Sequence, residues 1–146
     1  MNTFTEKRFQ PSHALGPEEK NRVVGKIKDH LLQYVDIVFA CVHGSFVNSD
    51  TFRDIDIAVF TSAEQDFYFE SDLSYELSSL TGFDSEVRII NKAPVAFQMA
   101  VLKDGLLLFS RDEEARTDAI ENVGKRYREY AHFRNIFMGC EGVRHQ

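Results

Sequence analysis

Apolar residues recur along the chain in two patterns, one typical of helices and one typical of strands. Val23, Ile27 and Leu31 follow Pro17 at helical spacing and predict a helix, since proline is well tolerated in a first helical turn. Short apolar runs rich in β-branched residues predict strands. The predicted helices cover residues 17–32, 46–52, 66–80, 94–103 and 112–138, and the predicted strands cover 37–42, 54–60, 86–90 and 106–109. This alternation indicates an α/β (α+β) fold with a mixed sheet flanked by helices.

The last predicted helix carries both an apolar side and a cationic cluster. We expect its buried side to comprise Ile120, Val123, Tyr127, Tyr130 and Ile136. The cationic cluster comprises Lys125, Arg126, Arg128 and Arg134. We interpret the cluster as a solvated helix face, with an acidic partner or RNA as the alternatives. The first and last helices are the expected partner surfaces, with both tyrosines in the core.

Length and charge limit the function classes. The chain has 146 residues, enough for a single domain with a buried core, and we expect an N-terminal segment at 1–16, the domain at 17–138 and a tail at 139–146. No stretch has the apolar length of a membrane span or signal peptide, so we expect a cytoplasmic protein that does not bind membranes. The formal net charge of −6 argues against binding long nucleic acid, whose phosphates attract basic surfaces.

Two carboxylates share one face of a predicted strand. Successive strand residues point to opposite faces, so Asp54 and Asp56 lie on one side while Ile55 and Ile57 lie on the other. Like charges this close resist ionising together unless a cation neutralises both. Mg²⁺ prefers oxygen ligands and usually shares one or two carboxylates with substrate phosphates. The pair therefore predicts a magnesium site used together with a phosphorylated substrate.

A Gly-Ser pair ends the preceding apolar run and supplies a complementary feature. Gly44 lets the backbone approach a phosphate closely, and the Ser45 hydroxyl adds a hydrogen-bond donor. Such a pair alone usually means only a turn. Its combination with two strand carboxylates favours a nucleoside triphosphate as the substrate.

These segments resemble a known enzyme superfamily. Residues 42–46 (VHGSF) and 53–59 (RDIDIAV) resemble the nucleotidyltransferase superfamily typified by DNA polymerase beta. The chain over about residues 36–137 is also similar to the minimal nucleotidyltransferases that act as antitoxins beside HEPN-type ribonuclease toxins. The resemblance implies a single-domain polymerase-beta-like nucleotidyltransferase fold. It also implies that the chain forms a hetero-oligomer with a HEPN toxin. The toxin would be inactivated when the chain transfers AMP from ATP to a tyrosine of the toxin.

The resemblance also implies roles for individual residues. Gly44 and Ser45 would hold the triphosphate. Arg53, which lies outside the family pattern, is a further candidate for phosphate contact, with a solvated side chain as the alternative. Asp54 and Asp56 would bind two catalytic Mg²⁺ ions. A third carboxylate on a later strand aligns with Glu86, and Asp84 on the same face is the reserve candidate.

Three departures from the family pattern keep other functions open. Eight residues separate Ser45 from Asp54, fewer than usual, Arg53 stands where the family has serine, and Glu86 stands where it has aspartate. The short linker and Glu86 favour a domain that keeps the fold and binds a partner without catalysis. A small-molecule acceptor, such as an aminocyclitol, is a third possibility, and surface carboxylates without a function are the fourth.

The cysteines suggest neither a disulfide framework nor a metal site. Cys41 and Cys140 are the only two, and neither has metal-ligand spacing. Cys41 and His43 share a strand face, where a zinc pair is conceivable. We expect a buried thiol beside a histidine at the mouth of the site instead.

Overall fold

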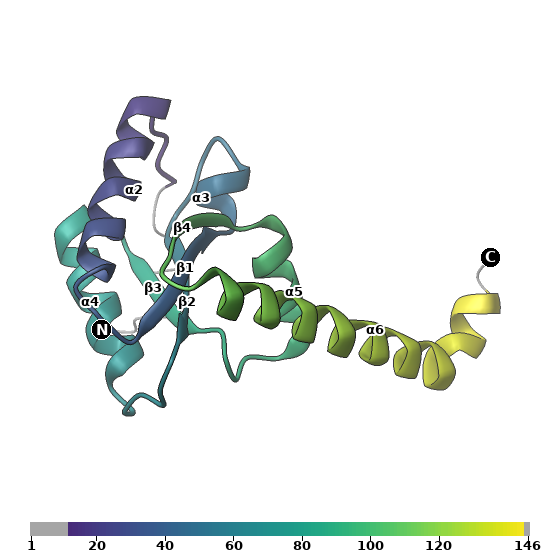
Figure 1. The fold of residues 1–146 in the computed structure, drawn as a ribbon. Helices are drawn as coiled ribbons and strands as arrows, with labels where there is room; N and C mark the ends of the chain where they lie inside the picture. Colours follow the sequence, from purple (N-terminus) through teal and green to yellow (C-terminus); the bar gives the residue numbers. More distant parts are fainter. Residues whose placement is uncertain (1–11, 145–146) are drawn as a thin grey trace.

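A mixed four-stranded sheet forms the centre of the molecule in the computed structural model, which describes residues 12–144 and side chains up to residue 137 (Figure 1). The strands are β1 (Ile37–His43), β2 (Ile55–Thr61), β3 (Ser85–Ile89) and β4 (Leu106–Ser110). Their order is β3-β2-β1-β4, with β2 parallel to β3 and the other pairs antiparallel. The predicted N-terminal segment falls mostly on residues outside the described part, as does the end of the predicted tail.

Helices cover both faces of this sheet. They are α2 (Pro17–Leu31), α3 (Ser45–Asn48), α4 (Phe69–Thr81), α5 (Val95–Asp104) and α6 (Glu113–Arg144). Helices α2 and α4 lie on one face, and α5 with the first half of α6 lies on the other (Figure 1). The predicted α+β fold is confirmed. Within residues 12–144, every helix lacks the apolar length needed to cross a bilayer.

Strand β2 separates two apolar cores. Its Ile55, Ile57 and Val59 are fully buried against α2 and α4, together with Leu73 and Leu77. The opposite face carries a smaller core formed by Phe39, Cys41, Ala58, Ile90 and Val101. The acidic face of β2 is therefore apolar only in its later part, where α5 and α6 cover it. At its beginning the same face is left for the carboxylates.

Helix α3 is shorter than predicted, because tertiary contacts end it. It stops at Asn48 instead of reaching residue 52, and the next residue, Ser49, is extended. Phe52 instead exchanges two backbone hydrogen bonds with His13, at 2.7 and 3.0 Å. The Lys20 ammonium donates to the carbonyls of Phe46 and Ser49, at 2.8 and 3.1 Å, and so ties α3 to α2. A single helical turn accommodates the short linker before β2.

The predicted buried side of α6 is correct at Val123, partly correct at half-buried Tyr127 and wrong at Ile120, Tyr130 and Ile136. Val123 is buried, but Ile120, Tyr130 and Ile136 are 39%, 40% and 60% exposed. The helix also continues past residue 138 to Arg144. Beyond the sheet, no other helix or strand of residues 12–144 lies beneath it (Figure 1). The expectation that Tyr130 and Ile136 lie in the core was wrong for this reason.

Replacing Gly25 and Gly82 by alanine should change the stability of the protein in opposite directions. Neither change causes a steric clash, because a Cβ at either position has no neighbouring side chain or remote backbone atom within 4 Å. Gly25 lies inside α2, so Gly25→Ala should raise the free energy of unfolding by up to about 1 kcal/mol. Gly82 ends α4 with φ 80°, so Gly82→Ala should lower it by about 1 kcal/mol. Denaturant unfolding measures both variants. The same sign of change in the two would contradict this account.

Candidate functional site

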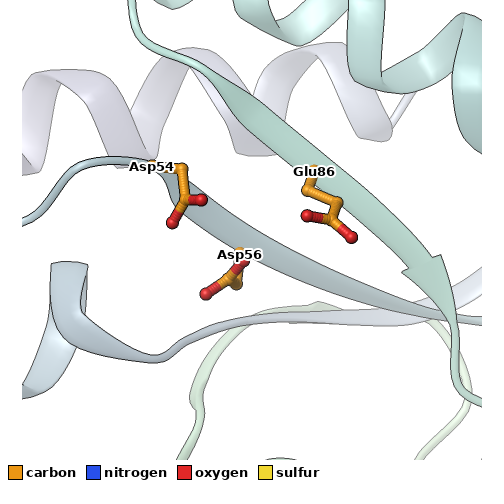
Figure 2. Close-up of side chains that lie close together, drawn as sticks. All are labelled: Asp54, Asp56 and Glu86. Carbon is orange, nitrogen blue, oxygen red and sulfur yellow. The ribbon is translucent and has the colours of Figure 1, made fainter. Parts of the chain in front are cut away.

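Three carboxylates from two neighbouring strands converge at one end of the sheet. Asp54 precedes β2, Asp56 is in β2, and Glu86 is in β3, where the parallel register pairs it with Asp56. One carboxylate oxygen from each lies within 4.8 Å of the others. Figure 2 shows the three side chains extending to the same side of the two strands. Asp54 and Asp56 are half-buried and Glu86 is exposed, so the group is open to solvent.

The Gly44 backbone approaches this acidic group closely. Gly44 links β1 to α3 with φ 78° and ψ −157°, a conformation that side chains other than glycine's hydrogen rarely allow. A Cβ at this position would lie 2.6 Å from Oδ2 of Asp56. The Gly-Ser turn and the carboxylates thus form one site, with exposed Ser45 as the first residue of α3.

The other sequence candidates lie nearby. Arg53 is exposed and directly precedes Asp54. Asp84 precedes β3, and its carbonyl accepts a hydrogen bond of 2.8 Å from the Ile55 amide. The carboxylate group found among the described residues contains Glu86 and not Asp84. Asp84 therefore aligns the two strands through its backbone.

His43, Arg88 and Phe97 border the carboxylates. His43 lies opposite Asp56 in the β1–β2 pairing, and its ring meets the Phe97 ring edge-on at 5.5 Å. The Arg88 guanidinium carbon lies 4.2 Å from the centre of the same ring. Burial lowers the pKa of His43 below 6.5, and the Arg88 charge lowers it further against the opposing effect of Glu86. The imidazole is therefore neutral at pH 7.

Sequence reasoning missed Phe97 as part of the site. The residue lies in α5, and only the folding of that helix across the sheet brings it to β1 and β3. The alternation along β3 does place Arg88 on the face of Glu86, but it carries no signal for a ring beneath the guanidinium. No local spacing could have identified this contact.

Cys41 is a core residue. It is buried and free, and burial raises the pKa of its thiol to about 11. A protonated thiol is a poor zinc ligand. The expectation of a buried thiol beside a histidine at the site is consistent with this environment, whereas the side chain of Cys140 lies outside the described residues.

The donor set fits a hard divalent cation. All three converging groups are carboxylates, and Mg²⁺ takes oxygen ligands with room left for substrate phosphates. Three carboxylates held together also favour binding of positive charge for electrostatic reasons. Asp54, Asp56 and Glu86 could hold such an ion, next to a turn suited to an anionic ligand.

Comparisons with known proteins agree with this geometry. The model of the family described as polymerase beta nucleotidyltransferase matches residues 25–114, more than half of the chain. No curated protein sequence matches significantly.

Solved structures of toxin–antitoxin proteins share the fold. A chain of the MntA–HepT toxin–antitoxin crystal structure is 16% identical, with a TM-score of 0.65 over 85% of this chain and 97% of its own. A chain of a toxin–antitoxin structure with AMP-PNP is 18% identical, with a TM-score of 0.68 over 82% of this chain and 95% of its own. A chain of the complex of tri-AMPylated Shewanella oneidensis HEPN toxin with MNT antitoxin is 17% identical, with a TM-score of 0.64 over 83% of this chain and 93% of its own. At such low identity these likenesses establish the fold.

Mg²⁺ should stabilise the protein through the three carboxylates. At about 100 times its dissociation constant, the ion should raise the free energy of unfolding by about 2.7 kcal/mol. Asp56→Asn should abolish this gain, because it removes the central ligand. Asp84→Asn is the matched control and should retain it, since Asp84 lies outside the group. Thermal unfolding with and without Mg²⁺ measures the effect, and equal responses of the two variants would refute the site.

Gly44→Ala should damage both stability and metal binding. Its φ and the 2.6 Å approach to Asp56 force the backbone or the carboxylate to move, lowering the free energy of unfolding by about 1–3 kcal/mol. The affinity for Mg²⁺, measured by calorimetry, should fall with it. Gly25→Ala serves as the control because it should leave the affinity unchanged. An unaltered Mg²⁺ affinity in Gly44→Ala would show that this approach does not shape the site.

Proposed function

The chain belongs to the polymerase beta nucleotidyltransferase family, and we propose that it transfers AMP from ATP to a hydroxyl group with the help of Mg²⁺. The observation that carries this proposal is the convergence of Asp54, Asp56 and Glu86 beside the Gly44 turn. Transfer of a nucleotide from a triphosphate needs ligands for a hard cation, and it needs a turn beside them that binds the phosphates. We assign this activity to a catalytic unit at residues 17–138.

Each residue has a distinct proposed role. Asp54, Asp56 and Glu86 would hold two Mg²⁺ ions. Gly44 and Ser45 bind the triphosphate, with Arg53 as a further phosphate contact. When bound, the ions neutralise charge on the attacking and leaving oxygens.

The proposed reaction forms no covalent bond between the protein and the substrate. The acceptor oxygen attacks the α-phosphorus of ATP, the bond to the β-phosphate breaks, and pyrophosphate leaves with the bonding electrons. Glu86, which is exposed at the edge of the group, accepts the hydroxyl proton. Positioning of the acceptor and neutralisation of charge supply most of the rate enhancement.

The proposed acceptor is a tyrosine of a HEPN-type toxin from the same genome, with which the chain forms a hetero-oligomer. Two observations on other proteins support it: the fold is shared with antitoxins in complexes with HEPN toxins, and one such toxin is AMPylated. The chain would then act as an antitoxin in the cytoplasm, where ATP is abundant. The net charge of −6 also suits a protein acceptor better than long nucleic acid.

ATP labelled at the α-phosphate tests this function directly. The toxin, Mg²⁺ and labelled ATP are incubated with the wild type, Asp54→Asn or Asp84→Asn. We expect labelling of the toxin with the wild type and with Asp84→Asn, and a loss of about 100-fold or more with Asp54→Asn, because a metal ligand is removed. Replacing the acceptor tyrosine by phenylalanine should remove the label.

Other outcomes would favour other functions. Label in a small-molecule fraction instead of protein would indicate an aminoglycoside-type transferase. Tight binding of the toxin with no transfer from any nucleotide would indicate a binding module that has lost catalysis. Equal transfer by the wild type and Asp54→Asn would contradict the proposed site.

A further inference from the structure

The two halves of α6 have different surroundings. The first half packs on the sheet and on α5, with Ala119 against the smaller core and Val123 buried. The second half extends away from the rest of the molecule (Figure 1). Three aromatic residues of this half, Tyr130, Phe133 and Phe137, are 40%, 60% and 69% exposed. We refer to them as the aromatic stripe.

The aromatic stripe continues the face that is buried in the first half. Ala119, Val123 and Arg126 contact the domain at spacings of four and three, and the stripe follows at four, three and four. Such regular alternation is the pattern of a helix seam that packs along another helix. The Phe133 and Phe137 rings lie 4.3 Å apart and form one continuous apolar surface. Within the described part of the chain, the seam therefore extends beyond the surface on which its first half packs.

The size of the stripe suits the centre of a protein interface. Aromatic side chains bury about 150–250 Å² each when fully covered, so the exposed 40%, 60% and 69% of the three offer roughly 250–400 Å² to a partner. A stable interface buries about 800 Å² on each partner, and its strongest contacts are aromatic residues at its centre. Spacings of three and seven from Tyr130 are those of a helix lying in an apolar groove.

The charge around the stripe indicates the chemistry of the partner. Residues 125–137 hold four cations and a single acid, Glu129, whereas the whole chain has a net charge of −6. The Arg126 guanidinium is fixed by Gln98 and Asn122, at 2.9 and 2.8 Å, and Arg134 lies 5.8 Å from the Tyr130 ring. A groove rimmed by Asp and Glu side chains would complement this segment.

A second copy of the chain fits less well. Stripe-to-stripe packing would bring two cationic segments together. Packing of the stripe on the acidic body of another copy would be a heterologous contact, which builds open assemblies unless it closes into a ring. A different protein avoids both difficulties.

We propose that the aromatic stripe docks in an apolar, acid-rimmed groove of the acceptor protein and so holds that protein beside the carboxylates. Helix α6 packs on the same sheet face that carries Asp56 and Glu86, so a protein bound along α6 lies on the catalytic side. The identity of this partner rests on the proposed function. The binding itself requires neither nucleotide nor catalysis.

The test measures binding of the HEPN-type toxin to the chain by calorimetry without nucleotide. Phe133→Asp/Phe137→Asp should raise the dissociation constant at least about 30-fold, as expected for central aromatic contacts. Tyr75→Asp is the matched control, because Tyr75 is an aromatic residue of similar exposure, 67%, on α4 at the opposite face. It should bind like the wild type, and so should Asp54→Asn. Circular dichroism should show that all variants are folded.

Charge and oligomeric state provide two further measurements. Arg128→Glu/Arg134→Glu should weaken binding about tenfold or more, and added salt should weaken wild-type binding. Light scattering should give a monomer for the wild-type chain alone.

The outcomes separate this inference from the proposed function. If the stripe variant loses binding but the wild type transfers no AMP, docking stands and the function fails. If the stripe variant binds and transfers normally, docking is refuted and the function stands. Absence of any toxin binding by the wild type, or a dimer that the stripe substitutions dissociate, would also overturn the docking proposal.

Discussion

The pairing register of β2 is the constraint on which the rest of the site depends. One face of β2 carries the fully buried Ile55, Ile57 and Val59, and this places Asp56 on the opposite face. There Asp56 pairs with Glu86 of β3 and with His43 of β1, the two neighbouring strands. A slip of one residue would place carboxylates in the apolar core, which costs far more free energy than a lost ladder hydrogen bond. Burial of the apolar face thus holds together charges that repel one another.

The Gly44 turn depends on the same register. Its backbone can pass close to Asp56 only because glycine has no Cβ and tolerates φ 78°. Contacts remote from the carboxylates hold the turn in place: Lys20 reaches from α2 to the end of α3, and Phe52 pairs with His13 before β2 begins. The linker can therefore be short without displacing either Gly44 or Asp54.

Local sequence patterns predicted those features that are local in origin. Alternation along the strands predicted that Asp54 and Asp56 share a face, and the predicted helix end at residue 80 lies one residue before the end of α4 at Thr81. The length of α3 could not be predicted, because it is set by Phe52 pairing with a segment far along the chain. The Arg88–Phe97 contact likewise depends on where α5 lies. For α6, the predicted apolar side shares only Val123 and Tyr130 with the observed seam, and periodicity could not reveal that the sheet ends before the helix does.

Net charge describes this chain poorly, because its charges are segregated. The value of −6 is a sum over the whole chain, whereas Asp54, Asp56 and Glu86 form a local acidic group and residues 125–137 of α6 hold four cations and one acid. At physiological ionic strength the Debye length is about 8 Å, so exposed charges farther apart than this scarcely influence one another. Each region therefore selects its own ligand: the carboxylates attract cations, whereas the helix segment attracts acidic surfaces. The expectation that the chain does not bind long nucleic acid rests on its net charge alone and says nothing against a local cationic contact.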